Sequence, residues 1–283
     1  MTEAVWRCRD HVFPLGERTL LMGVVNVTPD SFSDGGLFLQ TDDAVEHGLQ
    51  LSAEGADIVD VGGESTRPGA EPVSIDEETA RVVPVIERLR AEAPHAAISV
   101  DTRHPEVARA ALAAGAHIVN DVTAAADPAT IEAVRDTGAG LVLMHMQGEP
   151  RSMQANPTYG DVVTEVRDFL AARIEVVTGA GVPRDRLCVD PGLGFGKTTA
   201  HNLALLRGIA SFRGLGALLV GASRKRFIGE LTGVDEPAGR AEGTAGVVAW
   251  CASQGVDVVR VHDVKEMAKV AKVVDAIARG ASL

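Results

Sequence analysis

The most constraining feature of this 283-residue sequence is a regular alternation of two kinds of segment. Short, β-branched apolar runs alternate with longer, Ala-rich stretches whose apolar residues recur at helical spacing. The apolar runs are nearly unbroken, as expected of parallel strands that are covered on both faces. Eight such runs occupy residues 20–26, 57–63, 97–102, 117–122, 141–145, 186–192, 218–223 and 258–263.

A helical pattern follows each of these runs. Pro105 lies in a predicted first helical turn, and Gly115 and Gly255 lie near predicted helix ends, where these residue types are favoured. The predicted helices cover residues 42–56, 76–92, 105–116, 129–137, 161–178, 200–212, 238–253 and 264–279. Consecutive βα units indicate a parallel α/β fold, and eight of them predict a (β/α)8 TIM barrel, which needs roughly 250 residues.

An open, doubly wound sheet is the alternative fold. Such a sheet gathers its functional residues near one switch point, whereas polar residues end every strand here. The sequence contains no evident linker and no repeat besides the eightfold alternation. We therefore predict a single barrel domain over residues 19–283, preceded by a short N-terminal extension over residues 1–18 that forms a cap or a hairpin.

The charge and cysteine content argue against several classes of protein. The net charge of −12 repels polyanions, so binding to nucleic acid or to a membrane surface is not expected. Cys8, Cys188 and Cys251 are too few and too scattered for a disulfide framework or a zinc site. The N-terminus lacks the apolar segment of a signal peptide, and no stretch approaches the roughly 20 apolar residues of a membrane span. These features predict a cytoplasmic protein.

Three strand-end residues suit a flat heterocycle whose edge carries N–H groups. In a parallel barrel the loops after the strands share one face, where active sites are found, so polar residues at strand ends should converge there. Asp101, Asn120 and Asp190 end three of the predicted strands. A carboxylate facing parallel N–H groups accepts paired, charge-assisted hydrogen bonds. For Asp101 alone, a helix cap remains the alternative interpretation.

A second group of strand-end residues suits an anion. It consists of Asn26, Arg67, Lys225, Arg260 and His262. Arg260 and His262 are two residues apart, so their side chains should point the same way. Barrels often bind phosphate beside strands seven and eight. A local cationic cluster on an acidic protein indicates an anion pocket, and a salt-bridge network with neighbouring acids is the alternative.

Two long loops and several isolated residues complete the pattern. The loops that begin at Thr28 and Gly62 are long for βα connections, so we predict mobile lids, with surface connectors as the alternative. The segment GLGFGKTT resembles a phosphate-binding P-loop, but Pro191 occupies a position where that motif requires glycine. We expect His145 to be a hydrogen-bonded residue at the barrel mouth rather than a metal ligand. Asp60 lies inside its strand and receives no role.

Long motifs in the sequence resemble the dihydropteroate synthase family. LMGVVNVTPDSFSDGG, ending at Gly36, and GADIVDVGGESTRPGA, ending at Ala70, resemble the two signatures of that family. The likeness continues in family order through SVDT, VNDV, LMHMQGEPRSMQANPTYGDV, VDPGLGFGK, VGASRKRFIG and VRVHD. It covers nearly the whole chain from the first strand onward, and the resemblance is to the chromosomal bacterial enzymes of this family.

The resemblance implies a reaction. 6-Hydroxymethyl-7,8-dihydropterin pyrophosphate would condense with p-aminobenzoate to give 7,8-dihydropteroate and pyrophosphate, a step of folate synthesis and the target of sulfonamides. It also implies a dissociative, SN1-like path, Mg²⁺ as the cofactor and a homodimer. The implied catalytic residues are Asp34, Arg67, Asp101 and Lys225.

The resemblance further assigns residues to three subsites and to the metal. The implied pterin subsite contains Asp101, Asn120, Val122, Met144, Asp190, Phe195 and Lys225. The implied pyrophosphate subsite contains Asn26, Arg67, Arg260 and His262, with Mg²⁺ at Asn26. The implied p-aminobenzoate subsite contains Phe32, Thr66, Arg67, Pro68, Phe195, Ser223 and Lys225.

Three other functions fit parts of this pattern. A pterin-dependent methyltransferase module would share the pterin grip, but it has no use for an anion pocket. A catalytically silent, pterin-binding paralogue is disfavoured because Asn26, Asp34, Arg67 and Lys225 are all intact. A Schiff-base aldolase that uses Lys225 is disfavoured by the arginines on both sides of that lysine. Release of pyrophosphate that requires both substrates would separate these functions.

Overall fold

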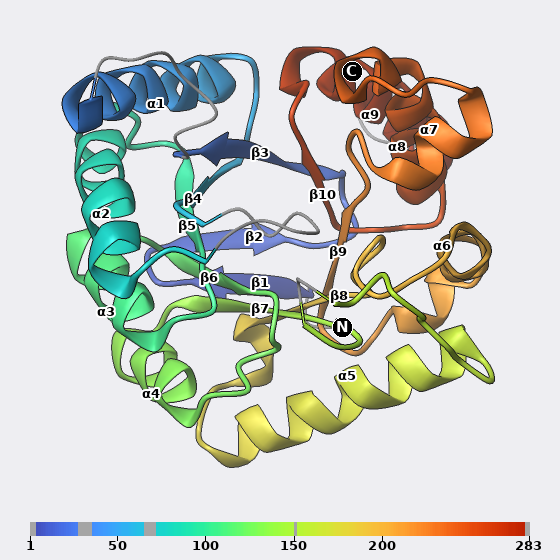
Figure 1. Cartoon of the computed structure of the whole chain (residues 1–283), viewed down its shortest axis with the longest axis horizontal. Coiled ribbons are helices and arrows are strands. Elements are labelled where there is room, and N and C mark those ends of the chain that lie inside the picture. The colour runs from blue at the N-terminus through green and yellow to red at the C-terminus, as the bar shows by residue number, and fades with distance from the viewer. Residues whose placement is uncertain (1–3, 28–35, 65–71, 150–151, 281–283) are drawn as a thin grey trace.

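Eight parallel strands close into a barrel, so the predicted (β/α)8 TIM barrel is confirmed (Figure 1). A computed structural model of the chain describes residues 4–27, 36–64, 72–149 and 152–280. The barrel strands are β3 (Leu20–Asn26), β4 (Ile58–Gly62), β5 (Ala97–Asp101), β6 (Ile118–Asp121), β7 (Gly140–Met144), β8 (Leu187–Asp190), β9 (Ala217–Gly221) and β10 (Val258–Val261). They follow one another around the ring in chain order, and β10 closes it against β3.

Helices surround the barrel (Figure 1). They are α1 (Gly36–Ala53), α2 (Ile75–Glu92), α3 (Pro105–Ala114), α4 (Pro128–Thr137), α5 (Val162–Gly179), α6 (Thr199–Arg207), α7 (Arg226–Thr232), α8 (Ala241–Ser253) and α9 (Val264–Arg279). Short 3₁₀ turns lie at η2 (Arg184–Arg186), η3 (Ile209–Phe212) and η4 (Pro237–Arg240).

Most differences from the predicted helices lie near glycine or proline. The sixth predicted helix is divided, because α6 ends at Arg207 with Gly208 as its C-cap, and η3 follows it. The predicted start of α8 is wrong, because η4 begins at Pro237 and precedes the helix. Helix α7 was not predicted, since its seven residues are too few to show a helical period. Helix α1 begins earlier than expected, at Gly36.

The hydrophobic core has two layers because successive strand residues point to opposite faces. Residues that face outward, such as Val59 and Ile98, pack under the helices in the larger cluster. Residues that face inward, such as Met22 and Ile58, form a second cluster with Trp6 from the N-terminal segment. Cys8 and Cys188 lie in this inner cluster, while Cys251 lies in the outer one, and all three thiols are free and buried.

Residues 5–14 form an antiparallel hairpin of β1 (Val5–Cys8) and β2 (His11–Pro14) that closes the amino-terminal end of the barrel. The Trp6 indole donates to the carbonyl of Arg186, just before β8, at 3.0 Å. Gly140, the first residue of β7, has no room for a side chain, because a Cβ there would lie 2.4 Å from the Cys8 sulfur. The division of the chain at residue 18 into an extension and a domain stays a prediction.

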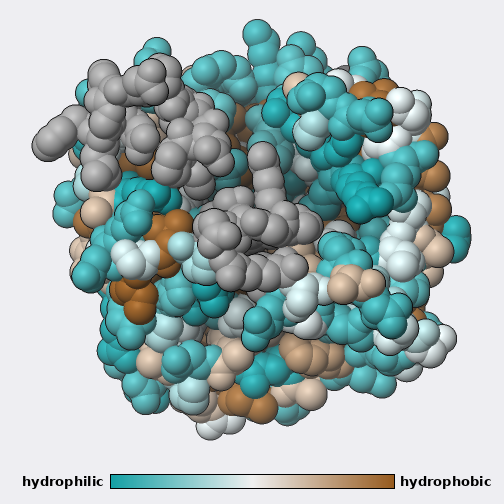
Figure 2. All heavy atoms as spheres, viewed as in Figure 1, coloured by the Kyte–Doolittle hydropathy of each residue, from teal (hydrophilic) through white to brown (hydrophobic). Residues whose placement is uncertain are grey.

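Hydrophilic side chains predominate on the face turned toward the viewer, and apolar ones are scattered (Figure 2). Within the described ranges, no helix combines the length and the hydropathy that crossing a bilayer requires.

Candidate active site

Strand register places several predicted site residues at one level of the barrel. Asn26 is paired with Gly62, Gly62 with Asp101, and Asp101 with Asn120 across four adjacent strands. All four lie at the carboxyl ends of their strands, where the active sites of such barrels are found. Gly62 contributes no side chain, so Asn26 and Asp101 flank a gap in this row.

Other predicted residues that the structure describes lie at the same end of the barrel. A Cβ placed on Gly221 would lie 3.7 Å from the Cβ of Arg260 and 3.9 Å from Oδ2 of Asp190. Arg260 therefore reaches the same part of the barrel as Asp190, although their strands are not adjacent. Val122 and Met144 are buried at the ends of β6 and β7.

Arg260 is held by two carboxylates. Its Nε lies 2.6 Å from Oδ2 of Asp60, and its Nη2 lies 2.7 Å from Oδ2 of Asp101. The sequence analysis placed Asp101 in the group for a heterocycle and Arg260 in the group for an anion, but the two residues are directly paired. In this structure Arg260 therefore belongs to a salt-bridge network with neighbouring acids, which was the alternative to an anion pocket. Asp101 is not a helix cap, since α3 has His104 at its N-cap position.

The environment of Asp101 shifts its titration. Burial raises the pKa of Asp101 to about 7, and the negative charge of Asp60 acts in the same direction, while Arg260 opposes both. The site thus contains an acid that titrates close to neutral pH.

Asp190, Lys225 and Phe195 form the other side of the site. Asp190 is the last residue of β8, and its Oδ1 accepts a hydrogen bond from the Gly192 amide at 2.8 Å. The Lys225 ammonium donates to the carbonyl of Leu193 and lies 4.6 Å from the centre of the Phe195 ring. Burial raises the pKa of Asp190, and burial lowers the pKa of Lys225 to about 8.

The loop after β8 packs tightly on the loop after β7. Gly192 and Gly196 both have positive φ, and a Cβ at either would clash with a carbonyl, 2.0 Å from that of His145 and 2.4 Å from that of Gln147. Tyr159 donates from its hydroxyl to the Gly196 carbonyl at 2.9 Å. The loop that carries Phe195 is therefore fixed on several sides.

Lys197 is a site residue that sequence reasoning missed. Its ammonium lies 3.0 Å from Nδ1 of His145, 3.3 Å from the His145 carbonyl and 2.9 Å from the Phe195 carbonyl. Burial lowers the pKa of Lys197 to about 7. His145 is buried and hydrogen-bonded at the mouth, as predicted. The only sequence signal for Lys197 was its place in the segment GLGFGKTT, which resembles a P-loop but lacks one of the glycines that this motif requires.

Ser223 and His262 lie together beside β9 and β10. The Ser223 hydroxyl oxygen is 2.9 Å from Nδ1 of His262 and accepts a hydrogen bond from the His262 amide at 3.2 Å. Between Ser223 and Lys225, Arg224 adopts a φ of +59° and pairs with Asp263. This left-handed turn directs Lys225 back toward the loop after β8.

Some predicted site residues lie outside the described part of the chain. They belong to the two long loops, and they are Phe32, Asp34, Thr66, Arg67 and Pro68. Their predicted roles stay predictions.

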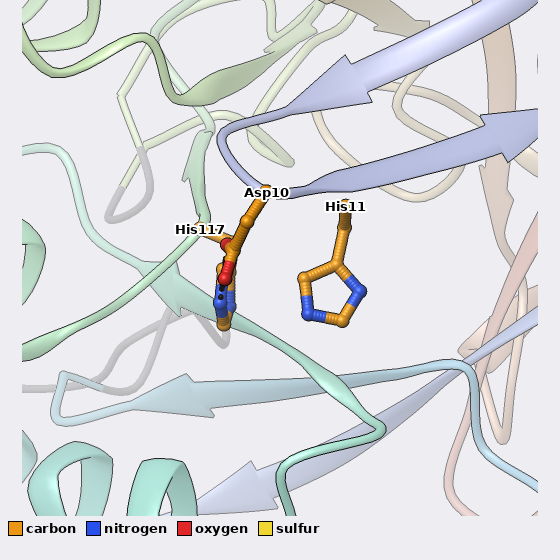
Figure 3. A group of neighbouring side chains, drawn as sticks. All are labelled: Asp10, His11 and His117. Carbon is orange, nitrogen blue, oxygen red and sulfur yellow. Dashed lines mark ion pairs between the residues drawn. The ribbon is translucent and has the colours of Figure 1, made fainter.

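One cluster at the opposite end of the barrel has the composition of a metal site. Asp10, His11 and His117 offer ligand atoms within 4.8 Å of one another (Figure 3). However, Nδ1 of His117 accepts a hydrogen bond from the Ile98 amide at 2.8 Å. A neutral imidazole that accepts at Nδ1 carries its proton on Nε2, the atom that lies 3.3 Å from Asp10. Asp10 of the hairpin thus faces Nε2 of His117, which makes no hydrogen bond within the described ranges, and the cluster does not present a free His117 lone pair to a metal.

A second group with such a composition is already occupied by hydrogen bonds. Glu64, Glu78 and His104 lie within the same 4.8 Å limit. Glu64 binds Arg103 through both oxygens, at 3.0 and 3.2 Å, and Glu78 lies 2.7 Å from Nδ1 of His104. These contacts engage both oxygens of Glu64, one oxygen of Glu78 and one ring nitrogen of His104, while Oε1 of Glu78 has no hydrogen-bond partner among the described residues.

Comparison with known proteins identifies the family. The model of a family of pterin binding enzymes matches residues 22–262. The dihydropteroate synthase of Escherichia coli (strain K12) is 47% identical over 257 residues, which cover 90% of each chain. The chain belongs to the dihydropteroate synthase family. The Mycobacterium leprae member is 49% identical over 265 residues, covering 90% of this chain and 92% of the relative.

Solved structures of the family agree with this assignment. The Xanthomonas albilineans dihydropteroate synthase with 4-aminobenzoic acid superposes with a TM-score of 0.91, at 46% identity over 98% of each chain. The same enzyme in complex with 7,8-dihydropteroate gives a TM-score of 0.87 at 44% identity, over 96% of this chain and 98% of the other. The resemblance drawn from the sequence is confirmed, and the chain is a transferase of this family. The methyltransferase and silent-paralogue alternatives are not favoured.

Proposed function

We propose that the residues converging at the carboxyl end of the barrel carry out the condensation of the dihydropteroate synthases. A pterin pyrophosphate and p-aminobenzoate are joined to give 7,8-dihydropteroate and pyrophosphate. The site assignment rests on one observation: hydrogen-bond acceptors and cationic side chains lie together at the carboxyl end of the barrel, which we call the rim. The residues that form this rim are Asp101, Asn120, Asp190, Lys225 and Arg260.

The pterin ring is recognised by acceptors at its edge and by apolar contacts on its faces. The carboxylates of Asp101 and Asp190 accept hydrogen bonds from the N–H groups of the ring, each contributing about 1.5–3 kcal/mol. Val122, Met144 and Phe195 cover the faces. Relatives that hold 4-aminobenzoic acid and 7,8-dihydropteroate support this use of the site.

The chemistry depends on departure of the leaving group. The amine of p-aminobenzoate is a weak nucleophile because its lone pair is delocalised into the ring. The bond from the pterin methylene carbon to the pyrophosphate oxygen therefore breaks before the bond to nitrogen forms. Arg260 and Lys225 stabilise the charge that develops on pyrophosphate, and Asp101 stabilises cationic character on the pterin. The amine loses its proton after the new bond has formed.

Asn26 suits the predicted Mg²⁺. Within the described ranges the Asn26 carboxamide makes no hydrogen bond, so its oxygen is available at the rim. Mg²⁺ prefers oxygen ligands and takes few from protein when phosphates supply the others. When bound, the ion neutralises charge on the pyrophosphate. Replacement of Asn26 by Ala should raise the Mg²⁺ concentration needed for half-maximal turnover by about tenfold, whereas an unchanged requirement would exclude Asn26 as a ligand.

Two further proposals concern the oligomeric state of the protein and its location in the cell. The protein forms a homodimer through its last helices, and Val273 and Ile277 on α9 support this, since they are 60% and 80% exposed. They are four residues apart and share one face of the helix. A cytoplasmic location fits the three free thiols.

Pyrophosphate release that depends on both substrates is the test of the proposed function. Asp101→Asn and Lys225→Ala should each lower this release by at least about 100-fold, because each removes a group that acts on developing charge. Circular dichroism and thermal unfolding would establish that both variants remain folded. Native rates in both folded variants would refute the site assignment.

A further inference from the structure

Asp60 is a buried carboxylate that the reaction above does not use. It lies within β4, is 0% exposed, and contacts residues of two other strands inside the barrel. Its Oδ2 accepts hydrogen bonds from Nδ2 of Asn120 at 3.1 Å and from Nε of Arg260 at 2.6 Å. Its Oδ1 has no hydrogen-bond partner among the described residues. A buried carboxylate is costly even when it is paired, so its presence points to a role other than stability.

The first consequence concerns the orientation of Asn120. A carboxylate can only accept hydrogen bonds, so the Asn120 atom next to Asp60 must be its amide nitrogen. The carboxamide is planar, and its oxygen therefore points away from Asp60. Asn120 is in register with Asp101 at the barrel rim. Asp60 thus makes Asn120 present an acceptor beside the Asp101 carboxylate, which matches a heterocycle edge rich in N–H groups.

The second consequence concerns Arg260. Asp60 accepts from Nε, while Asp101 accepts from the neighbouring Nη2 of the same guanidinium. Under the proposed function, the N–H groups of the pterin bind Asp101 and compete with Nη2 for that carboxylate. The contact between Asp60 and Nε can persist when Asp101 no longer accepts from Nη2. The N–H groups of Nη1 and Nη2 then become available to a diphosphate.

We propose that Asp60 is a positioning residue that couples recognition of the two halves of the substrate. It orients Asn120 toward the pterin, and it anchors Arg260 while the pterin replaces Arg260 on Asp101. The inference rests on the proposed function. Its consequence is that the protein binds diphosphate more tightly when a pterin ring already occupies the rim.

Calorimetric titrations of the whole protein test this coupling. Inorganic pyrophosphate is titrated in Mg²⁺ buffer with and without saturating 6-hydroxymethylpterin, which lacks the diphosphate. In the native protein, the pterin should raise the affinity for pyrophosphate by about tenfold. In Asp60→Asn, which keeps the shape but removes the charge, the enhancement should fall below about twofold. Steady-state kinetics should show a higher KM for the pterin pyrophosphate and an unchanged KM for p-aminobenzoate.

Ser99→Ala is the matched control. Ser99 is paired with Asp60 in register, is also 0% exposed, and its hydroxyl has no hydrogen-bond partner in the described ranges. This variant should retain the native enhancement. If Asp60→Asn does not fold, Arg260→Lys tests the same coupling, because an ammonium cannot hold Asp60 and a diphosphate as a guanidinium fork can.

The outcomes separate the inference from the function on which it rests. Loss of the enhancement in Asp60→Asn or Arg260→Lys, with the enhancement kept in Ser99→Ala, supports the inference. A native enhancement in the folded Asp60→Asn protein overturns the inference alone. If the native protein binds no pterin, the proposed function fails, and the inference fails with it.

Discussion

Gly192 illustrates how one residue position can constrain the site. Its φ of +67° is unfavourable for any residue with a side chain, and a Cβ there would lie 2.0 Å from the carbonyl oxygen of His145. Gly233 has a similar φ of +73°, but nothing lies within 4 Å of its would-be Cβ. A substitution at Gly233 would therefore report only the energetic cost of the backbone conformation, whereas one at Gly192 would add the cost of the steric clash.

Gly192→Ala should reduce the free energy of unfolding much more than Gly233→Ala does. The conformational cost alone is about 1–2 kcal/mol, and both variants share it. The clash at Gly192 should add about 1–3 kcal/mol, because backbone must move to relieve it. Urea unfolding monitored by circular dichroism measures both values. Equal losses of stability in the two variants would show that the contact with His145 can relax freely.

At this scale the sequence predicted the residues at strand ends and missed two others. Asp101, Asn120 and Asp190 follow apolar runs, and the geometry of a parallel barrel brings such residues to one rim. Asp60 could not be assigned, since its partners come from strands far away in sequence. Lys197 was missed because its role depends on a carbonyl from the preceding loop.

Among the elements, the N-terminal hairpin depends on a histidine whose titration is unusual. His117 is 1% exposed, and burial lowers its pKa to about 4, with nearby His11 and Arg90 acting in the same direction. An unfolded histidine has a pKa of about 6.5. Between these two values the unfolded chain binds a proton that the folded protein does not bind. His117 therefore destabilises the fold as the pH falls from about 6.5 to about 4.

His117→Asn should reduce this loss of stability at acid pH. Asparagine can still accept a hydrogen bond from the Ile98 amide, but it does not titrate. The measurement is urea unfolding of both proteins at pH 7, 6 and 5. Asp101, whose pKa is raised, acts in the opposite direction, so the difference between the two proteins is the informative quantity. A constant difference at the three pH values would contradict the assignment.

Sequence reasoning located the strands better than the helix boundaries. Each predicted apolar run overlaps one barrel strand, because burial on both faces leaves a continuous apolar signature, and only β7 and β9 begin one residue before the predicted run. For the first residues the sequence left two expectations open, a cap or a hairpin. The choice depends on contacts between the hairpin and the amino-terminal end of the barrel, which are distant in sequence. Helix α7 depends on the turn at Arg224, which local composition does not reveal.

For the whole molecule, the proposed homodimer predicts a change of mass. Ile277→Asp places a charge at an 80% exposed position on α9, so it should leave the fold intact and separate the subunits. Light scattering after size exclusion would then give the mass of one chain instead of two. Val176→Asp on α5 is the control, since Val176 is also exposed but lies on another helix. A native protein that already has the mass of one chain would refute the dimer.

The three free thiols have a practical consequence for following how the molecule opens. Cys8 lies in strand β1 of the hairpin, Cys188 inside the ring of strands and Cys251 in the helical layer, and burial raises the pKa of each. A thiol reacts as its thiolate and only where a reagent can reach it, so none should be modified while its own layer stays closed. Measuring the rate at which each thiol is modified during unfolding would therefore show when the hairpin, the ring of strands and the helical layer open. No cysteine would have to be introduced for this experiment.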